Sequence, residues 1–162
     1  MYSVKSMFVI LLISLFLCAS SQAQKSESVN WLTFEQLQDS LAVKPKKVFI
    51  DFYTEWCTYC RKMDKVVFTK PDVINLLNDQ YYAIRFDAES DETVNFSGQV
   101  FQNEQSGKSR NPVHQIAQLL GGRNNKFTPP VLVVLDQDFR ITARYFQYMD
   151  SKKLVMALNE GR

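Results

Sequence analysis

The chain has 162 residues, of which 46% are hydrophobic and 22% are charged. This length and composition indicate one folded domain and exclude a disordered chain or a disulfide-dense miniature protein. The formal net charge of +2 gives no support for nucleic-acid binding, which usually requires a clearly basic domain. Three cysteines are present, an odd number, so at least one of them has no partner within the chain.

The first 23 residues have the three parts of a secretory signal peptide. Lys5 precedes an apolar run from Met7 to Leu17, and Ser21-Gln22-Ala23 then places small residues at the −3 and −1 positions of a cleavage site. The run is too short to span a bilayer, which takes about 20 residues. We therefore expect an exported protein from which residues 1–23 are removed.

Removal of this segment changes the cysteine count. Cys18 lies inside it, so only Cys57 and Cys60 remain in the mature chain. A lipoprotein anchor at Cys18 is the alternative, but lipidation wants a small residue before the cysteine and Leu17 stands there. We expect a polar, mobile lead over 24–30 and a folded domain over 31–162.

Apolar periodicity predicts alternating helices and strands in this domain. The strands are expected at 48–53, 81–86, 131–135 and 141–146, with a small hairpin at 94–96 and 99–101 around Ser97-Gly98. The helices are expected from Thr33 (with Gln36 as capping-box partner), over 57–68, after Pro71, from Asn111-Pro112 to Gly121-Gly122, and after Asp150. This order predicts an α/β domain, a central mixed sheet with helices on both faces.

The two remaining cysteines form a Cys-x-x-Cys motif at a junction between a buried strand and a helix. Residues three apart share one helical face, so Cys57 and Cys60 can form a disulfide. Cys57 would lie at the helix N-terminus, where backbone N–H groups favour an anion, so we expect its thiol pKa to lie below that of a free cysteine. Arg61 and Lys62 could add to this effect, while Cys60 faces the core.

This asymmetry implies a mechanism of thiol–disulfide exchange. A Cys57 thiolate attacks a substrate disulfide, and Cys60 then attacks the mixed disulfide and releases the reduced substrate. Cys60 must lose a proton in an apolar setting, and Asp51 is the candidate base because it is the only acid in the strand over 48–53. Asp51 could instead be an ordinary hydrogen-bonded core carboxylate.

The segment from Phe49 to Cys60 resembles the active-site segment of thioredoxin-fold proteins, with the acid six residues before the first cysteine. The resemblance covers most of residues 31–161. Within this fold family, the chain resembles secreted thioredoxin-like proteins of Gram-negative bacteria and the catalytic domain of the periplasmic thiol:disulfide interchange reductase. It implies a thioredoxin fold, location in a periplasm, protein disulfides as substrates and a membrane or periplasmic dithiol as electron donor. It implies no metal or organic cofactor, and we expect a monomer.

The same resemblance implies a cis-proline that faces the cysteines and binds substrate backbone. Thr128-Pro129-Pro130 supplies two candidates. In the family the proline usually stands six residues before the position of Asp136, and this spacing selects Pro130 over Pro129. Trp56, Thr58 and Tyr59 are expected to contact the substrate as well, although Trp56 and Tyr59 could serve packing alone.

The chain also departs from the family pattern in ways that bear on substrate choice. No histidine lies between the cysteines, since His114 is the only one and is expected on a helix flank; this argues against a very strong oxidant. Gln147 stands where the family often has a glycine, and the loop over 91–110 is longer than in a minimal thioredoxin.

Four alternatives to a protein-disulfide reductase or isomerase remain. A zinc site would need four ligands, and the mature chain has only His114 to add to the cysteines. A static disulfide is possible in an exported protein, and Thr54 three residues before Cys57 also fits a peroxide-reducing cysteine. We predict an exported protein-disulfide reductase or isomerase; the fourth alternative, motivated by the long loop and Gln147, is a thioredoxin-like binding module with a structural disulfide.

Overall fold

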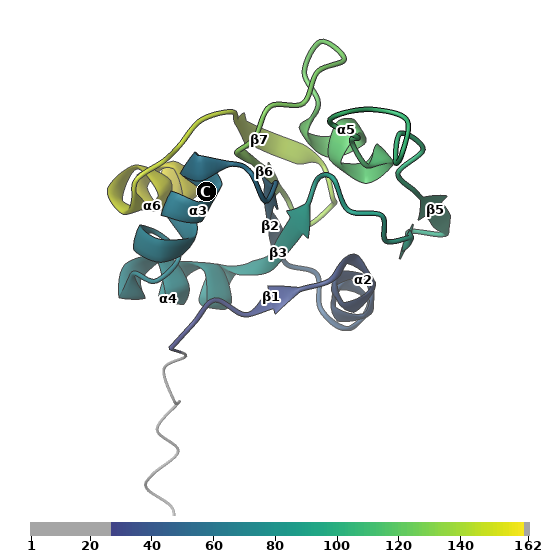
Figure 1. Cartoon of the computed structure of the whole chain (residues 1–162). Coiled ribbons are helices and arrows are strands. Elements are labelled where there is room, and N and C mark those ends of the chain that lie inside the picture. The colour runs from purple at the N-terminus through teal and green to yellow at the C-terminus, as the bar shows by residue number, and fades with distance from the viewer. Residues whose placement is uncertain (1–26, 161–162) are drawn as a thin grey trace, which may run out of the picture.

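The computed structural model describes residues 27–160 and shows one twisted sheet between two layers of helices (Figure 1). The strands are β1 (Trp31–Leu32), β2 (Lys47–Tyr53), β3 (Tyr81–Asp87), β4 (Val94–Phe96), β5 (Gln99–Phe101), β6 (Val131–Leu135) and β7 (Ile141–Tyr145). The helices are α2 (Phe34–Val43), α3 (Thr58–Val66), α4 (Pro71–Gln80), α5 (Gln115–Gly121) and α6 (Ser151–Glu160). The predicted signal peptide, with Cys18, lies outside the described residues.

The central sheet is mixed, as predicted, with the strand order β1-β3-β2-β6-β7. The strands β1, β3 and β2 run parallel, whereas β6 and β7 are antiparallel to their neighbours. β2 is therefore the central strand, and Asp51 stands opposite Arg85 of β3 on one side and Leu132 of β6 on the other. The hairpin of β4 and β5 forms a separate two-stranded sheet, and only the short β1 was not predicted.

Side-chain alternation along β2 divides the core into two clusters. Phe49 packs with apolar residues of α3, α4 and α6, and Ile50 and Phe52 pack with those of α2, α5 and the β4–β5 hairpin. Figure 1 shows the same division, with α3, α4 and α6 on one side of the sheet and α2 and α5 on the other. Asp51 lies between Ile50 and Phe52 in sequence, so its side chain points to the face covered by α3.

Two predicted helix starts are confirmed. Thr33 and Gln36 form the capping box of α2, each side chain bonding the other residue's backbone N–H. At the last helix, the carboxylate of Asp150 accepts a hydrogen bond from the Lys153 N–H, 2.9 Å long.

The predicted start of α5 is wrong. The helix begins at Gln115 rather than after Asn111-Pro112, and its N-cap is His114, whose Nδ1 accepts from the Ile116 N–H at 3.2 Å. The His114 N–H donates to the Ala88 carbonyl and the Gln115 N–H to that of Gln102, and these bonds hold His114 in its extended backbone conformation. His114 is also fully buried instead of lying on a helix flank.

The end of the predicted lead is bound to the domain. Val29 is buried, and Asn78 of α4 accepts from the Asn30 N–H and donates to the Ser28 carbonyl. The described part of this segment therefore packs on α4 rather than leading freely into the domain. No helix within residues 27–160 is long and apolar enough to cross a membrane.

Candidate active site

The turn from β2 into α3 places the first cysteine at a helix N-terminus. The Cys57 N–H donates to the Thr54 carbonyl at 3.1 Å, which closes the turn, and Cys57 is the N-cap of α3. Its Sγ accepts a hydrogen bond from the Cys60 N–H, also 3.1 Å long. Cys57 thus takes the position that Ser, Thr or Asp usually fills, where a side-chain atom satisfies a free N–H of the first helical turn.

Cys57 and Cys60 are joined by a disulfide, with their Cα atoms 5.3 Å apart. The two residues are only 4% and 2% exposed, so the disulfide is largely shielded from solvent. The predicted pairing is confirmed. Within residues 27–160, no group of three or more His, Cys, Asp or Glu side chains is arranged to hold a metal ion.

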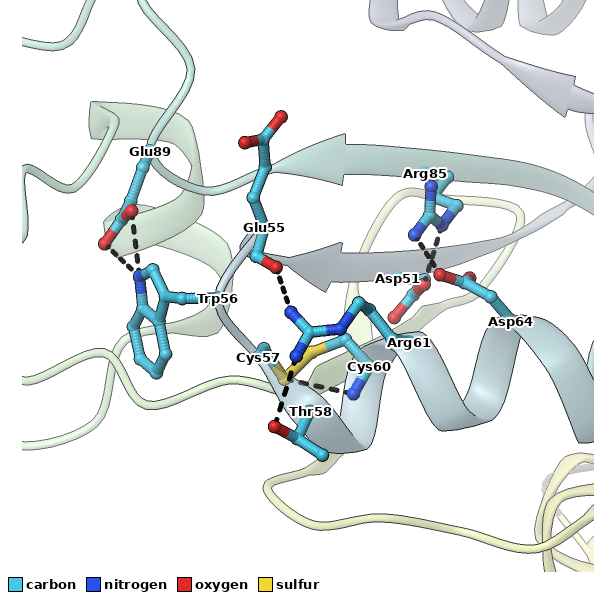
Figure 2. Close-up of a disulfide and its surroundings, with 10 residues drawn as sticks. All are labelled: Asp51, Glu55, Trp56, Cys57, Thr58, Cys60, Arg61, Asp64, Arg85 and Glu89. Carbon is cyan, nitrogen blue, oxygen red and sulfur yellow. Dashed lines mark hydrogen bonds and ion pairs between the residues drawn. A yellow bond between two sulfur atoms is a disulfide. The ribbon is translucent and has the colours of Figure 1, made fainter.

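The residues next to the cysteines in sequence are exposed at the surface. Trp56 is 53% exposed and Tyr59 60% exposed, and Thr58 is exposed too. The Trp56 Nε1–H donates to both carboxylate oxygens of Glu89 at 3.0 Å (Figure 2). Tyr59 packs against Tyr148, with ring centroids 6.0 Å apart, so both aromatic side chains are held in place.

Arg61 lies over the same turn. Its guanidinium donates to the Glu55 carbonyl and, at 3.3 Å, to the Thr58 hydroxyl (Figure 2). A cation is therefore fixed beside the N-terminus of α3, as its position after Cys60 suggested. Lys62, by contrast, lies with its Nζ 4.7 Å from the centre of the Tyr148 ring.

Asp51 lies beneath α3 in a group of three charges. Arg85 Nε is 3.4 Å from Asp51 Oδ2, and Arg85 Nη2 donates to Asp64 Oδ2 at 2.6 Å (Figure 2). Burial raises the pKa of Asp51 to about 7; the Arg85 charge lowers it and the Asp64 charge raises it further. Burial also raises the pKa of Asp64, against the effect of Arg85. One cation thus faces two carboxylates, and Asp51 changes its charge near neutral pH.

The strand register brings the proline segment to the same end of the sheet. Phe52 pairs with Val131, so the residues before β6 lie where β2 leads into the Cys57 turn. The Pro129–Pro130 bond is cis, as expected for Pro130. Thr128 is exposed and Pro130 buried, with Pro129 between them in exposure.

Arg85, Glu89 and Tyr148 were not identified from the sequence. Asp64 was not identified either, although its carboxylate is partly buried against Arg85. The one available signal for Arg85 was its position as the only cation in the strand over 81–86. Gln147 is exposed in the segment after β7, close to Tyr148 in sequence.

Comparison with known proteins identifies the family to which the chain belongs. Residues 34–162 match the family of thioredoxin-like domains. The thiol:disulfide interchange protein DsbD of Salmonella typhi is 36% identical over 64 residues, covering 37% of this chain and 11% of that protein. DsbD 2 of Pseudomonas aeruginosa is 53% identical over 30 residues, 18% of this chain and 5% of that protein. The chain thus matches about a tenth or less of the length of these relatives.

Solved structures give the same fold. The C-terminal domain of Neisseria meningitidis DsbD, in its reduced form, has a TM-score of 0.52 at 19% identity and covers 78% of this chain and 90% of its own. The DsbH oxidoreductase has a TM-score of 0.58 at 13% identity, covering 91% and 96%. A thioredoxin from Thermus thermophilus has a TM-score of 0.56 at 19% identity, covering 82% and 86%. The chain belongs to the family of thioredoxin-like domains and has the thioredoxin fold.

Proposed function

We propose that this protein is an exported thiol:disulfide oxidoreductase that reduces or isomerises protein disulfides. The observation that carries the proposal is the Cys57–Cys60 disulfide, which lies at the N-terminus of α3 on the same sheet face as Asp51. A disulfide needed only for stability has no requirement for a buried carboxylate on the same sheet face whose pKa is raised to about 7. Similarity to part of DsbD supports the same reaction class.

In the reduced protein, the Cys57 thiolate would attack one sulfur of a substrate disulfide. The substrate S–S bond breaks, a mixed disulfide to Cys57 forms, and the departing substrate thiolate takes up a proton. The hydrogen bond from the Cys60 N–H to Cys57 Sγ supports this step because it stabilises negative charge on the sulfur.

The second step releases the substrate. Cys60 gives its proton to the Asp51 carboxylate, and its thiolate attacks Cys57 Sγ. The mixed disulfide breaks, the Cys57–Cys60 disulfide forms, and the second substrate sulfur leaves as a thiolate. Two electrons pass from the cysteine pair to the substrate, and a dithiol donor in the periplasm or its membrane restores the reduced pair.

Around this centre we assign substrate contacts to Trp56, Thr58 and Tyr59 on one side and to Thr128, Pro129 and Pro130 on the other. The support is their position: the first three are exposed beside the disulfide, and the last three precede the strand that pairs with β2. A substrate segment lying between them would present its sulfur to Cys57.

The proposal is tested by reduction of a fluorescence-quenched peptide disulfide with dithiothreitol as electron donor. We expect the mature chain to accelerate this reaction and Cys57→Ser to abolish the acceleration. Equal rates with wild type and Cys57→Ser would show that the disulfide is structural.

The binding-module alternative is separated by a trapping experiment. Cys60→Ser retains the attacking cysteine but cannot release the substrate, so an exchange enzyme accumulates mixed disulfides through Cys57 in a periplasmic extract. Cys57→Ser/Cys60→Ser is the matched control and should trap nothing. Within the 91–110 segment that motivated the alternative, the β4–β5 hairpin is bound to α2, since Glu35 and Gln38 accept from the N–H groups of Asn95 and Ser97.

A further inference from the structure

A basic pocket lies at the same end of the sheet as the disulfide. Leu132 pairs with Tyr145, so the residues after β7 and those before β6 lie together at the end where β2 leads to Cys57. Figure 1 shows the segment between α5 and β6 projecting past this end. Between the two segments is a pocket of about 290 Å³, lined by Arg123, Asn124, Lys126, Thr128 and Phe146.

The backbone of this segment holds two cations next to each other. Arg123 and Lys126 exchange N–H to carbonyl bonds of 2.9 and 3.0 Å across a two-residue turn. Both turn residues, Asn124 and Asn125, have positive φ values of 52° and 58°, a conformation that Asn tolerates well. The Arg123 guanidinium lies 4.7 Å from the centre of the Phe146 ring, so it is directed toward the segment after β7.

Among the described residues, the side chains of Arg123 and Lys126 lack the carboxylate, carbonyl or hydroxyl partners that those of Arg85 and Arg61 have. Arg85 is bound by Asp51 and Asp64, and Arg61 is bound by the Glu55 carbonyl and Thr58. Within residues 27–160, neither Arg123 nor Lys126 has a carboxylate within ion-pair distance, and no acidic residue lines the pocket. Like charges in opposed positions repel each other, so an anion placed between them would relieve this repulsion.

We propose that this pocket binds an acidic side chain of the substrate protein, an Asp or Glu within a few residues of the cysteine that Cys57 attacks. The inference rests on the proposed function, and Thr128 connects the two. It lines the pocket and also begins the Thr128-Pro129-Pro130 segment to which we assign substrate backbone. A side chain leaving that backbone would enter the pocket directly.

The test uses two synthetic peptides of the same length, each with one disulfide, that differ only by Glu or Gln beside the cysteine. Fully reduced protein is mixed with each peptide in a single turnover at low ionic strength. We expect the Glu peptide to be reduced about three- to tenfold faster, the effect of one carboxylate meeting two exposed cations. The difference should shrink as NaCl is added, since salt screens exposed charges.

The variant Arg123→Gln/Lys126→Gln should reduce both peptides at the same rate. The matched control is Lys152→Gln/Lys153→Gln, which removes the same net charge from exposed positions on α6 and should keep the preference. Uncharged 4,4′-dithiodipyridine has no side chain for the pocket, so it reports the chemistry of the cysteine pair and should react equally with all three proteins.

Equal rates for the two peptides with wild type, or a preference that survives in Arg123→Gln/Lys126→Gln, would overturn the inference while leaving the oxidoreductase intact. Loss of the preference in the α6 control as well would assign it to overall charge and also overturn the pocket. If the reduced protein fails to react even with dithiodipyridine, the proposed function fails, and this inference with it.

Discussion

Asp51 and Arg85 face each other across β2 and β3 but form only a partial ion pair. Arg85 Nε lies 3.4 Å from Asp51 Oδ2, outside hydrogen-bonding geometry, and Asp51 Oδ1 has no hydrogen-bond partner either. The better contact of Arg85 is with Asp64, at 2.6 Å. Burial therefore dominates at Asp51 and raises the pKa of its carboxyl from 3.8 to about 7 despite the nearby cation.

This arrangement makes stability depend on pH. Because the pKa of Asp51 is higher in the folded chain than in the unfolded one, its contribution is fully present below about pH 4 and is lost as pH rises through about 7. Asn has the shape of the protonated acid and cannot ionise. We expect Asp51→Asn to increase the free energy of unfolding at pH 8 by about 2–4 kcal/mol and to change it little at pH 4.

The measurement is urea unfolding of the oxidised proteins at both pH values. Asp39→Asn on the exposed face of α2 is the control and should give equal small changes at pH 4 and pH 8. A stabilisation of Asp51→Asn that is the same at both pH values would show that Asp51 does not ionise within the folded chain in this range.

The same substitution should slow the second step of the proposed reaction. Asp51 and Cys60 are both buried between the sheet and α3, and without the carboxylate the Cys60 thiol loses its proposed base. We expect release of the substrate from the mixed disulfide to be slower in Asp51→Asn by about 100-fold. In wild type, this rate should rise with pH through about 7 as Asp51 ionises, and the variant should lack that rise.

Acid quenching followed by alkylation and mass spectrometry measures the mixed disulfide directly. Formation of the mixed disulfide serves as the internal control, because it depends first on the Cys57 thiolate. If the mixed disulfide resolves equally fast in wild type and Asp51→Asn, Asp51 is only a core carboxylate.

The parts of the site that were predictable from sequence are those whose signals are local. Two cysteines three apart after a buried strand imply a pair at a helix N-terminus, and an acid within an apolar strand implies a buried carboxylate. Arg85 is 34 residues from Asp51 along the chain and meets it only through the parallel register of β2 and β3. Periodicity cannot supply that register, so the partner of the predicted base could not be named.

Helix boundaries failed where tertiary contacts outweighed a local signal. Asn111-Pro112 has the residue types of a helix start, yet α5 begins at Gln115. The hydrogen bond from the His114 N–H to the carbonyl of Ala88, the residue after β3, ties the chain down before the helix begins. Asp64 was missed for a similar reason: the apolar stripe of α3 does not show that the Arg85 guanidinium from β3 reaches Asp64 at the edge of the helix.

His114 predicts a second pH effect, of opposite sign. Its Nε2 lies 3.0 Å from the Glu92 carbonyl, which can only accept, so Nε2 carries the hydrogen and Nδ1 is free to cap Ile116. Burial lowers the pKa of His114 from 6.5, and stability is therefore lost as pH falls below about 6.5. Protonation would also remove the capping acceptor.

His114→Asn keeps a capping side chain but cannot titrate. We expect it to lower the free energy of unfolding by about 1–3 kcal/mol at pH 7.5, through the lost ring and its bond to Glu92. That deficit should narrow between pH 7 and pH 5, because only wild type then takes up the unfavourable proton. Thermal unfolding of both proteins between pH 5 and pH 7.5 measures this difference in stability. A difference that stays constant with pH would contradict a buried neutral imidazole at His114.

Gly121, the last residue of α5, allows the helix to approach the central strands. A Cβ at this position would lie 3.0 Å from the Phe127 ring and 3.1 Å from Val131 Cγ1, closer than packed carbons normally come. Ala is favoured over Gly in a helix by about 1 kcal/mol, but the overpacking should outweigh this gain. We expect Gly121→Ala to lower the free energy of unfolding by about 1–3 kcal/mol. Leu119→Ala on the same helix, where the side chain is 61% exposed, should change it by less than about 0.5 kcal/mol. Urea unfolding of the two variants decides the point, since a Gly121→Ala protein as stable as wild type would mean that α5 can move away from β6 without loss.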